Sequence, residues 1–198
     1  MLAGAAKGAS NAVAVTLGTG VGGGIVIDGK LYCGFHYGGA ELGHMGIVLG
    51  GRQCTCGRRG CLEAYASATG LIRSTKEAMD AHPDSLMWEV AGENGGAVSG
   101  RTAFLAAGRG DQAAQAVVDA YIEQLGYGLA SVINILAPEV LVIGGGVSNE
   151  GENLLRPLIA CVRPQMYVRD PAKQTRIVLA TLGNDAGLIG AAFLDRAR

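Results

Sequence analysis

One histidine and three cysteines lie close together between residues 44 and 61 of this chain, at His44, Cys54, Cys56 and Cys61. An imidazole nitrogen and three thiolates are a complete ligand set for a closed, tetrahedral zinc site. Glycines stand between the last two cysteines, where they permit the tight turns that bring sulfur atoms together. The spacing therefore predicts a zinc knuckle over residues 44–61, with all four side chains directed at one point.

The cysteine cluster has two other interpretations, a disulfide or a set of small buried apolar side chains. The chain contains five cysteines, an odd and modest number, and no apolar signal segment opens it. These features favour a reducing cytoplasm, where such a cluster is more often a metal site than a disulfide. Cys33 and Cys161 lie outside the cluster, and we expect them to be free thiols.

The composition argues against several classes of partner. The formal net charge is −1 and no dense run of lysine and arginine is present, so we expect no nucleic-acid partner. No apolar run approaches the roughly 20 residues that cross a membrane, so we expect no membrane partner. Hydrophobic residues make up 49% of the chain and charged residues 17%, which is typical of a folded globular protein. The length predicts one domain over residues 1–198.

Predicted strands and helices alternate along the chain. Short β-branched or apolar runs predict strands at residues 11–16, 24–27, 140–143 and 176–180. Asp28-Gly29 predicts a hairpin turn after the second strand. The continuous apolar run at 140–143 is typical of a strand covered on both faces. This alternation predicts an α/β fold with a mixed sheet and flanking helices.

Helical spacing of apolar residues predicts helices at 62–81, at 111–136, from Ser148 or Asn149 to 163, and from Asn184 or Asp185 to the C-terminus. The first is expected to break near Gly70, with Ser67 or Thr69 capping its second part. Gly126 and Gly128 lower the helix propensity of the second, so they predict close packing against another element. Residues 85–110 show only short helical patches.

Two glycine clusters, among the 33 glycines of the chain, follow predicted strands. Residues 17–24 read Leu-Gly-Thr-Gly-Val-Gly-Gly-Gly, and backbone N–H groups in such a turn can cradle phosphate oxygens. Residues 144–146 lie between a strand and a predicted helix start, where the helix dipole favours an anion. Each cluster alone is also compatible with an ordinary tight turn. Together they indicate a nucleotide that lies across one sheet.

Four motifs follow one another in a recognisable order: Leu17-Gly-Thr-Gly-Val-Gly-Gly-Gly, Glu41-Leu-Gly-His44, Cys54-x-Cys56-Gly-x-x-Gly-Cys61-x-Glu63 and Val142-Ile-Gly-Gly-Gly146. In this order, the chain resembles the ROK family of sugar kinases and repressors. The resemblance extends from about Lys7 to Gly190, and the cysteine motif is its most specific part.

The resemblance implies an actin-like (ribonuclease H-like) ATPase fold, in which residues 1–198 are the C-terminal lobe and contain the zinc knuckle. It implies ATP-dependent phosphorylation of glucose to glucose 6-phosphate, with Mg-ATP and a hexose as ligands. The implied site residues are Gly18, Thr19 and Gly20 for the ATP phosphates, Gly144 and Gly145 for the adenosine side, Glu41, His44 and Glu63 for the sugar hydroxyls, and His44, Cys54, Cys56 and Cys61 for a structural zinc ion.

Kinases of this family have a further N-terminal lobe that carries the catalytic aspartate, and this sequence does not match that lobe. We therefore expect the chain to be inactive alone, with no catalytic residue of its own. Asn184-Asp185-Ala186 looks like a catalytic element, but its position favours the cap of the last helix. Apolar residues of that helix, including Leu188 and Phe193, would be uncovered without the other lobe, which predicts a homo-oligomer.

Two other functions fit the same motifs. The repressors of the family carry a similar fold, so the chain is alternatively the sugar-sensing domain of a repressor. The intact glycine loops favour a kinase, because a repressor need not keep phosphate-binding turns. A kinase for fructose, N-acetylmannosamine or N-acetylglucosamine is the second alternative, since part of the sugar selectivity lies in the unmatched lobe.

Overall fold

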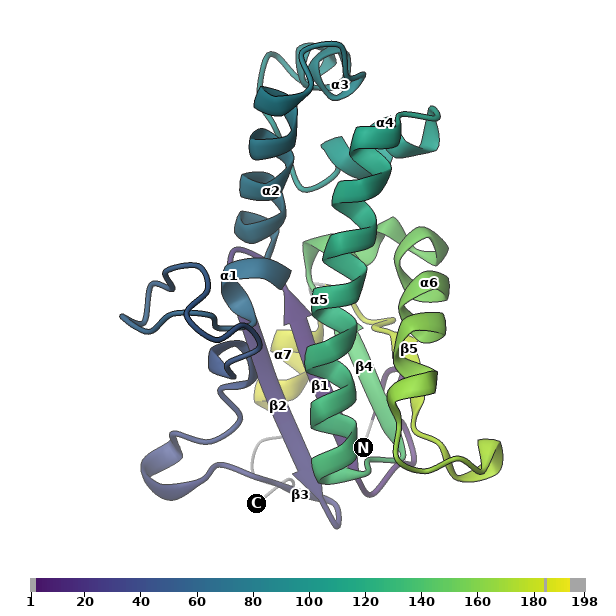
Figure 1. Ribbon diagram of the computed structural model, residues 1–198. Helices are drawn as coiled ribbons and strands as arrows, with labels where there is room; N and C mark the ends of the chain where they lie inside the picture. Colours follow the sequence, from purple (N-terminus) through teal and green to yellow (C-terminus); the bar gives the residue numbers. More distant parts are fainter. Residues whose placement is uncertain (1–2, 184, 193–198) are drawn as a thin grey trace.

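A five-stranded mixed sheet organises the computed structural model, which describes residues 3–183 and 185–192 (Figure 1). The strands are β1 (Ala12–Leu17), β2 (Val21–Ile27), β3 (Lys30–Leu31), β4 (Val140–Gly144) and β5 (Arg176–Leu179). Their order across the sheet is β3-β2-β1-β4-β5. β1 pairs antiparallel with β2 and parallel with β4, and β4 pairs parallel with β5. The prediction of an α/β fold with a mixed sheet is confirmed.

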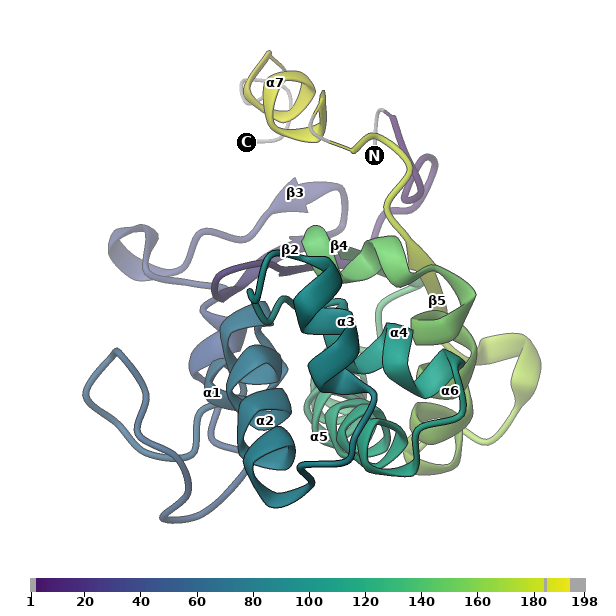
Figure 2. The same cartoon turned by 90° about the horizontal axis from the view of Figure 1, so that it is seen from above.

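The helices are grouped mainly on one face of the sheet. They are α1 (Glu63–Ala66), α2 (Ala68–Ala81), α3 (Met87–Glu93), α4 (Thr102–Gly108), α5 (Gln112–Leu136), α6 (Glu152–Val162) and α7 (Asp185–Ala192). Short 3-10 helices are η1 (Phe35–Tyr37), η2 (Leu42–His44), η3 (Gly146–Glu150), η4 (Arg163–Gln165) and η5 (Pro171–Lys173). Figure 2 shows α1 to α6 on one side of the sheet and α7 on the other. None of the described helices combines the length and apolar character needed to cross a bilayer.

Alternating side chains place β1 between two layers. Val13, Val15 and Leu17 are buried in the main core under the helices, whereas Ala14 and Thr16 are exposed on the other face. In β4 every residue is buried except Val142, which is half-buried and packs with a small cluster on the α7 side. β4 is therefore covered on both faces, as its continuous apolar run predicts.

The long helix α5 packs closely against its neighbours at its two interior glycines. A Cβ atom on Gly126 would lie 2.6 Å from the Cys161 Sγ, and one on Gly128 would lie 2.8 Å from the Leu62 Cδ1. Both distances are shorter than van der Waals contact, so a side chain at either position would require the Cys161 or Leu62 side chain to move. The predicted close packing is confirmed, and its partners are α6 and the residue that precedes α1.

Two local predictions are wrong. The first long helix breaks at Ser67 and not at Gly70. The prediction of Ser67 as a cap is confirmed, because its hydroxyl accepts a hydrogen bond from the Gly70 N–H at the start of α2. Neither Ser148 nor Asn149 caps a helix. Both lie in η3, and α6 begins only after Gly151, whose φ of 59° is a left-handed conformation that glycine adopts readily.

Several boundaries also differ from the predictions. β2 begins at Val21, three residues before the predicted start, because its glycines pair in register with β1. The uncertain region 85–110 contains α3 and α4. Asn184, one of two candidate caps for the last helix, lies outside the described residues, and α7 begins at Asp185. No residue of α7 is buried, and Leu188 is 75% exposed.

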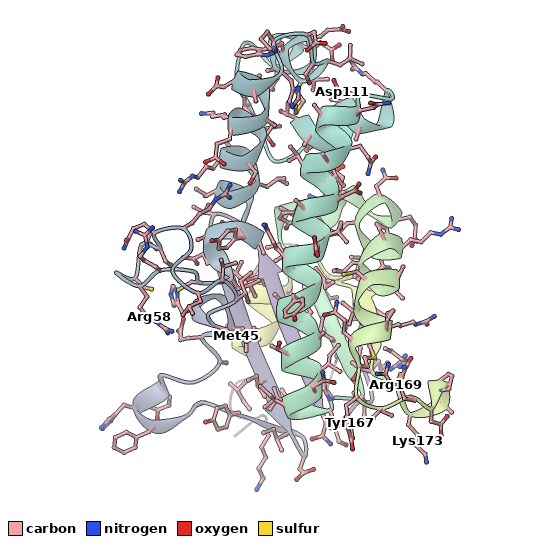
Figure 3. The ribbon with its side chains drawn as sticks, in the orientation of Figure 1. Met45, Arg58, Asp111, Tyr167, Arg169 and Lys173 are labelled. Carbon is pink, nitrogen blue, oxygen red and sulfur yellow. The ribbon has the colours of Figure 1, made fainter. Side chains whose placement is uncertain are left out.

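Asp111 joins α5 to the turn before α3, at the end of the helices farthest from the sheet (Figure 3). Its Oδ1 accepts a hydrogen bond of 2.7 Å from the Ala114 N–H, and its Oδ2 accepts from the Leu86 N–H and the Ser85 hydroxyl. Burial raises the pKa of Asp111, but these hydrogen bonds outweigh burial and hold the pKa below its ordinary value of 3.8.

We expect Asp111→Ala to lower the free energy of unfolding by about 1–2 kcal/mol, because α5 loses its N-cap. The pKa of the carboxyl group is lower in the folded chain, so its contribution is complete above the unfolded pKa and is lost as the pH falls through the folded value. Urea unfolding at pH 7 and near pH 3 measures both effects. Asp119→Ala, an exposed aspartate on the same helix, is the control, and an equal loss there would contradict the prediction.

Candidate functional site

The two glycine loops meet because β1 and β4 are parallel neighbours. Thr16 pairs with Gly144, so the segments after both strands leave the same edge of the sheet. An open hollow of about 390 Å³ lies at this edge, and it is lined by Thr16, Gly18, Thr19, Gly20, Val21, Gly22, Glu63 and Gly145. The structure thus brings together five of the residues that the sequence implicates in ligand binding, although Gly18 and Gly145 lie far apart in the sequence.

The first loop, residues 18–20, is a tight turn held from two sides. The Gly18 N–H donates to the Gly20 carbonyl oxygen at 3.0 Å. The Gly18 carbonyl oxygen accepts from the Ala68 N–H, and that of Thr19 accepts from the Thr69 hydroxyl, both at 2.8 Å. No described residue accepts a hydrogen bond from the N–H of Thr19 or Gly20. These two donors are therefore free to bind an anion such as a phosphate.

The contact between the first loop and the start of α2 was not predicted from the sequence. Thr69 was considered only as a helix cap, and Ala68 carries no polar side chain. The two segments are separated by 50 residues, and no local pattern pairs them.

The second loop requires glycine at Gly145. This residue has a φ of 86°, and a Cβ atom there would lie 2.6 Å from the backbone nitrogen of Leu17 at the end of β1. Gly144 ends β4 and does not line the hollow. The sequence-based prediction of an α-helix directly after this loop is wrong, since η3 follows it. Its short length leaves no α-helix dipole to favour an anion at the loop.

The predicted metal ligands converge. The ligand atoms of His44, Cys54, Cys56 and Cys61 all lie within 4.8 Å of one another. The Sγ atoms of Cys56 and Cys61 are 3.7 Å apart, and the Cys54 Sγ is 3.7 Å from the His44 Nδ1. Two Zn–S bonds of about 2.3 Å at a tetrahedral angle place their sulfurs about 3.8 Å apart. The donor set and its spacing therefore fit a tetrahedral zinc ion.

The disulfide alternative does not fit these distances. A disulfide joins two sulfurs at about 2.05 Å, and all five cysteines are free thiols. Burial, followed by hydrogen bonds to the neighbouring thiols, raises the pKa of Cys61 to about 12. A cation beside this sulfur would be needed to keep it as a thiolate near neutral pH.

The orientation of His44 is fixed by its surroundings. Its Nδ1 faces Cys54, which leaves Nε2 on the other side of the ring. The Arg58 guanidinium donates a hydrogen bond of 3.1 Å to the His44 carbonyl oxygen from within the knuckle loop (Figure 3). The Arg58 hydrogen bond holds the backbone of His44, and an imidazole can ligate a metal through one nitrogen and donate from the other. Arg58 was not singled out from the sequence.

Glu63 connects the cluster of His44, Cys54, Cys56 and Cys61 to the hollow. Its Oε2 accepts a hydrogen bond of 3.0 Å from the Val21 N–H, directly after the first loop. Its Oε1 accepts from the Thr55 hydroxyl at 3.2 Å and lies 3.8 Å from the Cys54 Sγ. One carboxylate therefore spans both parts of the site.

The other two predicted sugar ligands lie beside the hollow without lining it. His44 ends η2, and its side chain lies with those of the three cysteines. Glu41 immediately precedes η2, and its side chain is exposed. Buried Gly43 lets η2 pack on β2, because a Cβ atom there would clash with the Val21 carbonyl oxygen.

We expect Cys61→Ser to remove zinc binding and to lower the melting temperature of the chain, because a hydroxyl is a poor substitute for a buried thiolate ligand. Cys33→Ser, outside the cluster, should keep one zinc per chain. Metal analysis of the two purified variants and of the unchanged protein measures the difference. Equal zinc content in all three would contradict the ligand assignment.

The chain is similar to proteins of one family over most of its length. The model of the ROK family matches residues 1–198. The glucokinase of Halalkalibacterium halodurans is 41% identical over 195 residues, which are 98% of this chain and 58% of that protein. Among solved structures, a ROK family glucokinase from Streptomyces griseus, in complex with glucose and AMPPNP, is similar with a TM-score of 0.86 and 36% identity over 98% of this chain and 63% of that one.

A second solved structure is a ROK family transcriptional regulator, a homolog of the E. coli MLC protein. It is similar with a TM-score of 0.82 and 31% identity, over 99% of this chain and 48% of that one. This chain therefore spans about three fifths of the length of the two glucokinases and about half of the regulator. The match over every residue shows that the chain belongs to the ROK family.

Proposed function

We propose that this chain is the C-terminal lobe of an ATP-dependent glucokinase and that it binds the nucleotide and part of the sugar. The observation that carries the proposal is the hollow in which both glycine loops meet the Glu63 carboxylate. The similarity to a glucokinase whose structure contains glucose and AMPPNP supports the same assignment. The product would be glucose 6-phosphate.

Phosphoryl transfer depends on positioning and on stabilising charge on the transferred group. In this proposal the free N–H groups of Thr19 and Gly20 bind phosphate oxygens of Mg-ATP, with Gly18 forming the turn. Gly144 and Gly145 have no side chains, and they would therefore let the adenosine part of the nucleotide approach the edge of the sheet closely. Glu41, Glu63 and the Nε2 of His44 hydrogen-bond to vicinal sugar hydroxyls, for which carboxylates are suited because each can accept several hydrogen bonds.

Zinc in this site would be structural. His44, Cys54, Cys56 and Cys61 fill all four tetrahedral positions, so no position remains for a substrate. The ion would cross-link residues 44–61 and hold His44 and the start of α1 in place. Cys54, Cys56 and Cys61 would then act only by orienting their neighbours, whereas His44 would also hydrogen-bond to the sugar.

The described residues that line the hollow provide no free general base. Glu63 is the one carboxylate among them, and the Val21 N–H and the Thr55 hydroxyl already hydrogen-bond to it. We therefore propose that the aspartate that activates the sugar hydroxyl is supplied from outside this chain, and that the chain alone does not turn over glucose.

We expect the chain to bind Mg-ATP and Gly20→Ala to weaken that binding at least tenfold. A Cβ atom on Gly20 would clash with the Glu63 carboxylate, whereas one on Gly24 meets only the Ala14 Cβ at 3.9 Å. Gly24→Ala, in the same β-hairpin, is therefore the matched control. Isothermal titration calorimetry of the three proteins measures the change. Glucose 6-phosphate formation, coupled to NADP reduction, should be absent for all three.

The main alternative is a sugar-sensing repressor domain, which the similarity to the ROK transcriptional regulator supports. Glucose binding without any Mg-ATP binding would favour it. Fructose, N-acetylmannosamine and N-acetylglucosamine are alternative substrates for a kinase. If one of them displaces bound glucose, that sugar becomes the proposed substrate.

We also propose that the protein is cytoplasmic and homo-oligomeric. The five free thiols are consistent with a reducing compartment. The exposed apolar side chain of Leu188 on α7, which packs on no core residue, is consistent with association between copies. Sedimentation of the purified chain as a monomer at micromolar concentration would contradict self-association.

A further inference from the structure

The hollow lacks positive charge. Among the described residues, its lining contains no lysine or arginine and includes the carboxylate of Glu63. The phosphates of a nucleotide would meet backbone N–H groups there and no cationic side chain. Phosphate binding in proteins is commonly strengthened by an arginine, whose planar fork of donors matches two phosphate oxygens.

Arg101 forms an ion pair with the 3-10 helix that follows the second glycine loop. Its Nε donates to the Glu150 Oε1 at 3.2 Å, across 49 positions of the sequence. Glu150 is the last residue of η3, which begins next to Gly145. The side chain of Glu150 is only 5% exposed, whereas that of Arg101 is 66% exposed. The buried carboxylate therefore anchors one edge of an arginine that otherwise faces solvent.

The segment that carries Arg101 is also close to the first glycine loop. A Cβ atom on Gly100 would lie 3.8 Å from the Cβ of Ala68, and the Ala68 N–H donates to the Gly18 carbonyl oxygen. The turn before α4 is fixed in turn by a hydrogen bond of 2.9 Å from the Ser99 N–H to the buried Thr102 hydroxyl. Arg101 therefore stands on a fixed turn that lies close to the start of α2, which bonds to the first loop, and it is paired with η3, which follows the second loop.

The guanidinium group of Arg101 keeps unused donors. Within the described part of the chain, only its Nε is paired, and neither terminal nitrogen has a partner. Arg109, at the other end of α4, differs because both of its terminal nitrogens bond to Glu93 at 2.7–2.8 Å. An arginine with a purely structural role, such as Arg109, has both terminal nitrogens occupied by protein acceptors.

We infer that Arg101 is a nucleotide-binding residue, whose two terminal nitrogens donate hydrogen bonds to the phosphates of a nucleotide in the hollow. The inference rests on the proposed nucleotide-binding function and adds to it the cation that the hollow lacks. Glu150 is a positioning residue, because it orients the guanidinium without touching the ligand.

The test is calorimetric titration of the full 198-residue chain with MgADP and, separately, with adenosine. Arg101→Ala should weaken MgADP binding at least about tenfold, the loss expected for hydrogen bonds to a charged group, and should leave adenosine binding unchanged. Arg101→Lys should bind MgADP with intermediate affinity, because the charge is kept and the fork is lost. Arg109→Ala, the matched control on α4, should bind both ligands like the unchanged chain.

Glu150→Gln separates ligand contact from bracing, because it removes the ion pair and keeps the arginine. Its loss of MgADP affinity should be clearly smaller than that of Arg101→Ala. Equal losses in these two variants, or an equal loss of adenosine binding, would show that the pair only braces the fold and would overturn the inference. Unchanged MgADP binding by Arg101→Ala overturns the inference alone, whereas failure of the unchanged chain to bind MgADP overturns it together with the proposed function.

Discussion

The parallel pairing of β1 with β4 is the constraint on which the rest of the site depends. It brings the ends of two strands that are far apart in the sequence to one sheet edge, with Thr16 opposite Gly144. The backbone of Gly145 then packs against that of Leu17 at a distance that excludes any side chain. Loops that follow neighbouring parallel strands share one edge of the sheet, which is where ligands bind in many α/β folds. The hollow follows from this pairing.

Support for the same edge comes from the long helix α5. Gly128 receives the side chain of Leu62, directly before Glu63, and the Tyr121 hydroxyl donates a 2.8 Å hydrogen bond to the Ala66 carbonyl oxygen at the end of α1. Burial raises the pKa of Tyr121, so this hydroxyl stays protonated and remains a donor. α1 is only four residues long and cannot be stable alone. Its position, and with it that of Glu63, is therefore set by packing on α5.

Glu63 joins the cluster of His44 and three cysteines to the hollow, so that both are parts of one candidate site. The same carboxylate accepts hydrogen bonds from the knuckle loop and from the strand after the first glycine loop. Because residues 45–60 form no helix or regular strand, cross-linking by a metal would contribute directly to their order. A structural ion can in this way influence ligand binding without touching the ligand.

Local chemistry alone was enough to predict much of this protein. The spacing of Cys54, Cys56 and Cys61, the apolar runs of β1 and β4, and the helical spacing of apolar residues in α5 are properties of short segments. Side-chain spacing and backbone propensity act within a few residues, so a sequence displays them directly. The glycines of α5 likewise predicted close packing, although the sequence did not predict that their partners are Cys161 and Leu62.

Tertiary structure alone decided which distant segments meet. The hydrogen bond from Thr69 to Thr19 and the ion pair of Arg101 with Glu150 join segments that are 50 and 49 positions apart, and they have no local signature. Each depends on how helices pack on the sheet, which is determined by the burial of side chains from many elements at once. The sequence by itself therefore determined which residues are candidate metal ligands. Only the tertiary structure decided that they lie beside the two glycine loops, because that depends on how distant segments pack.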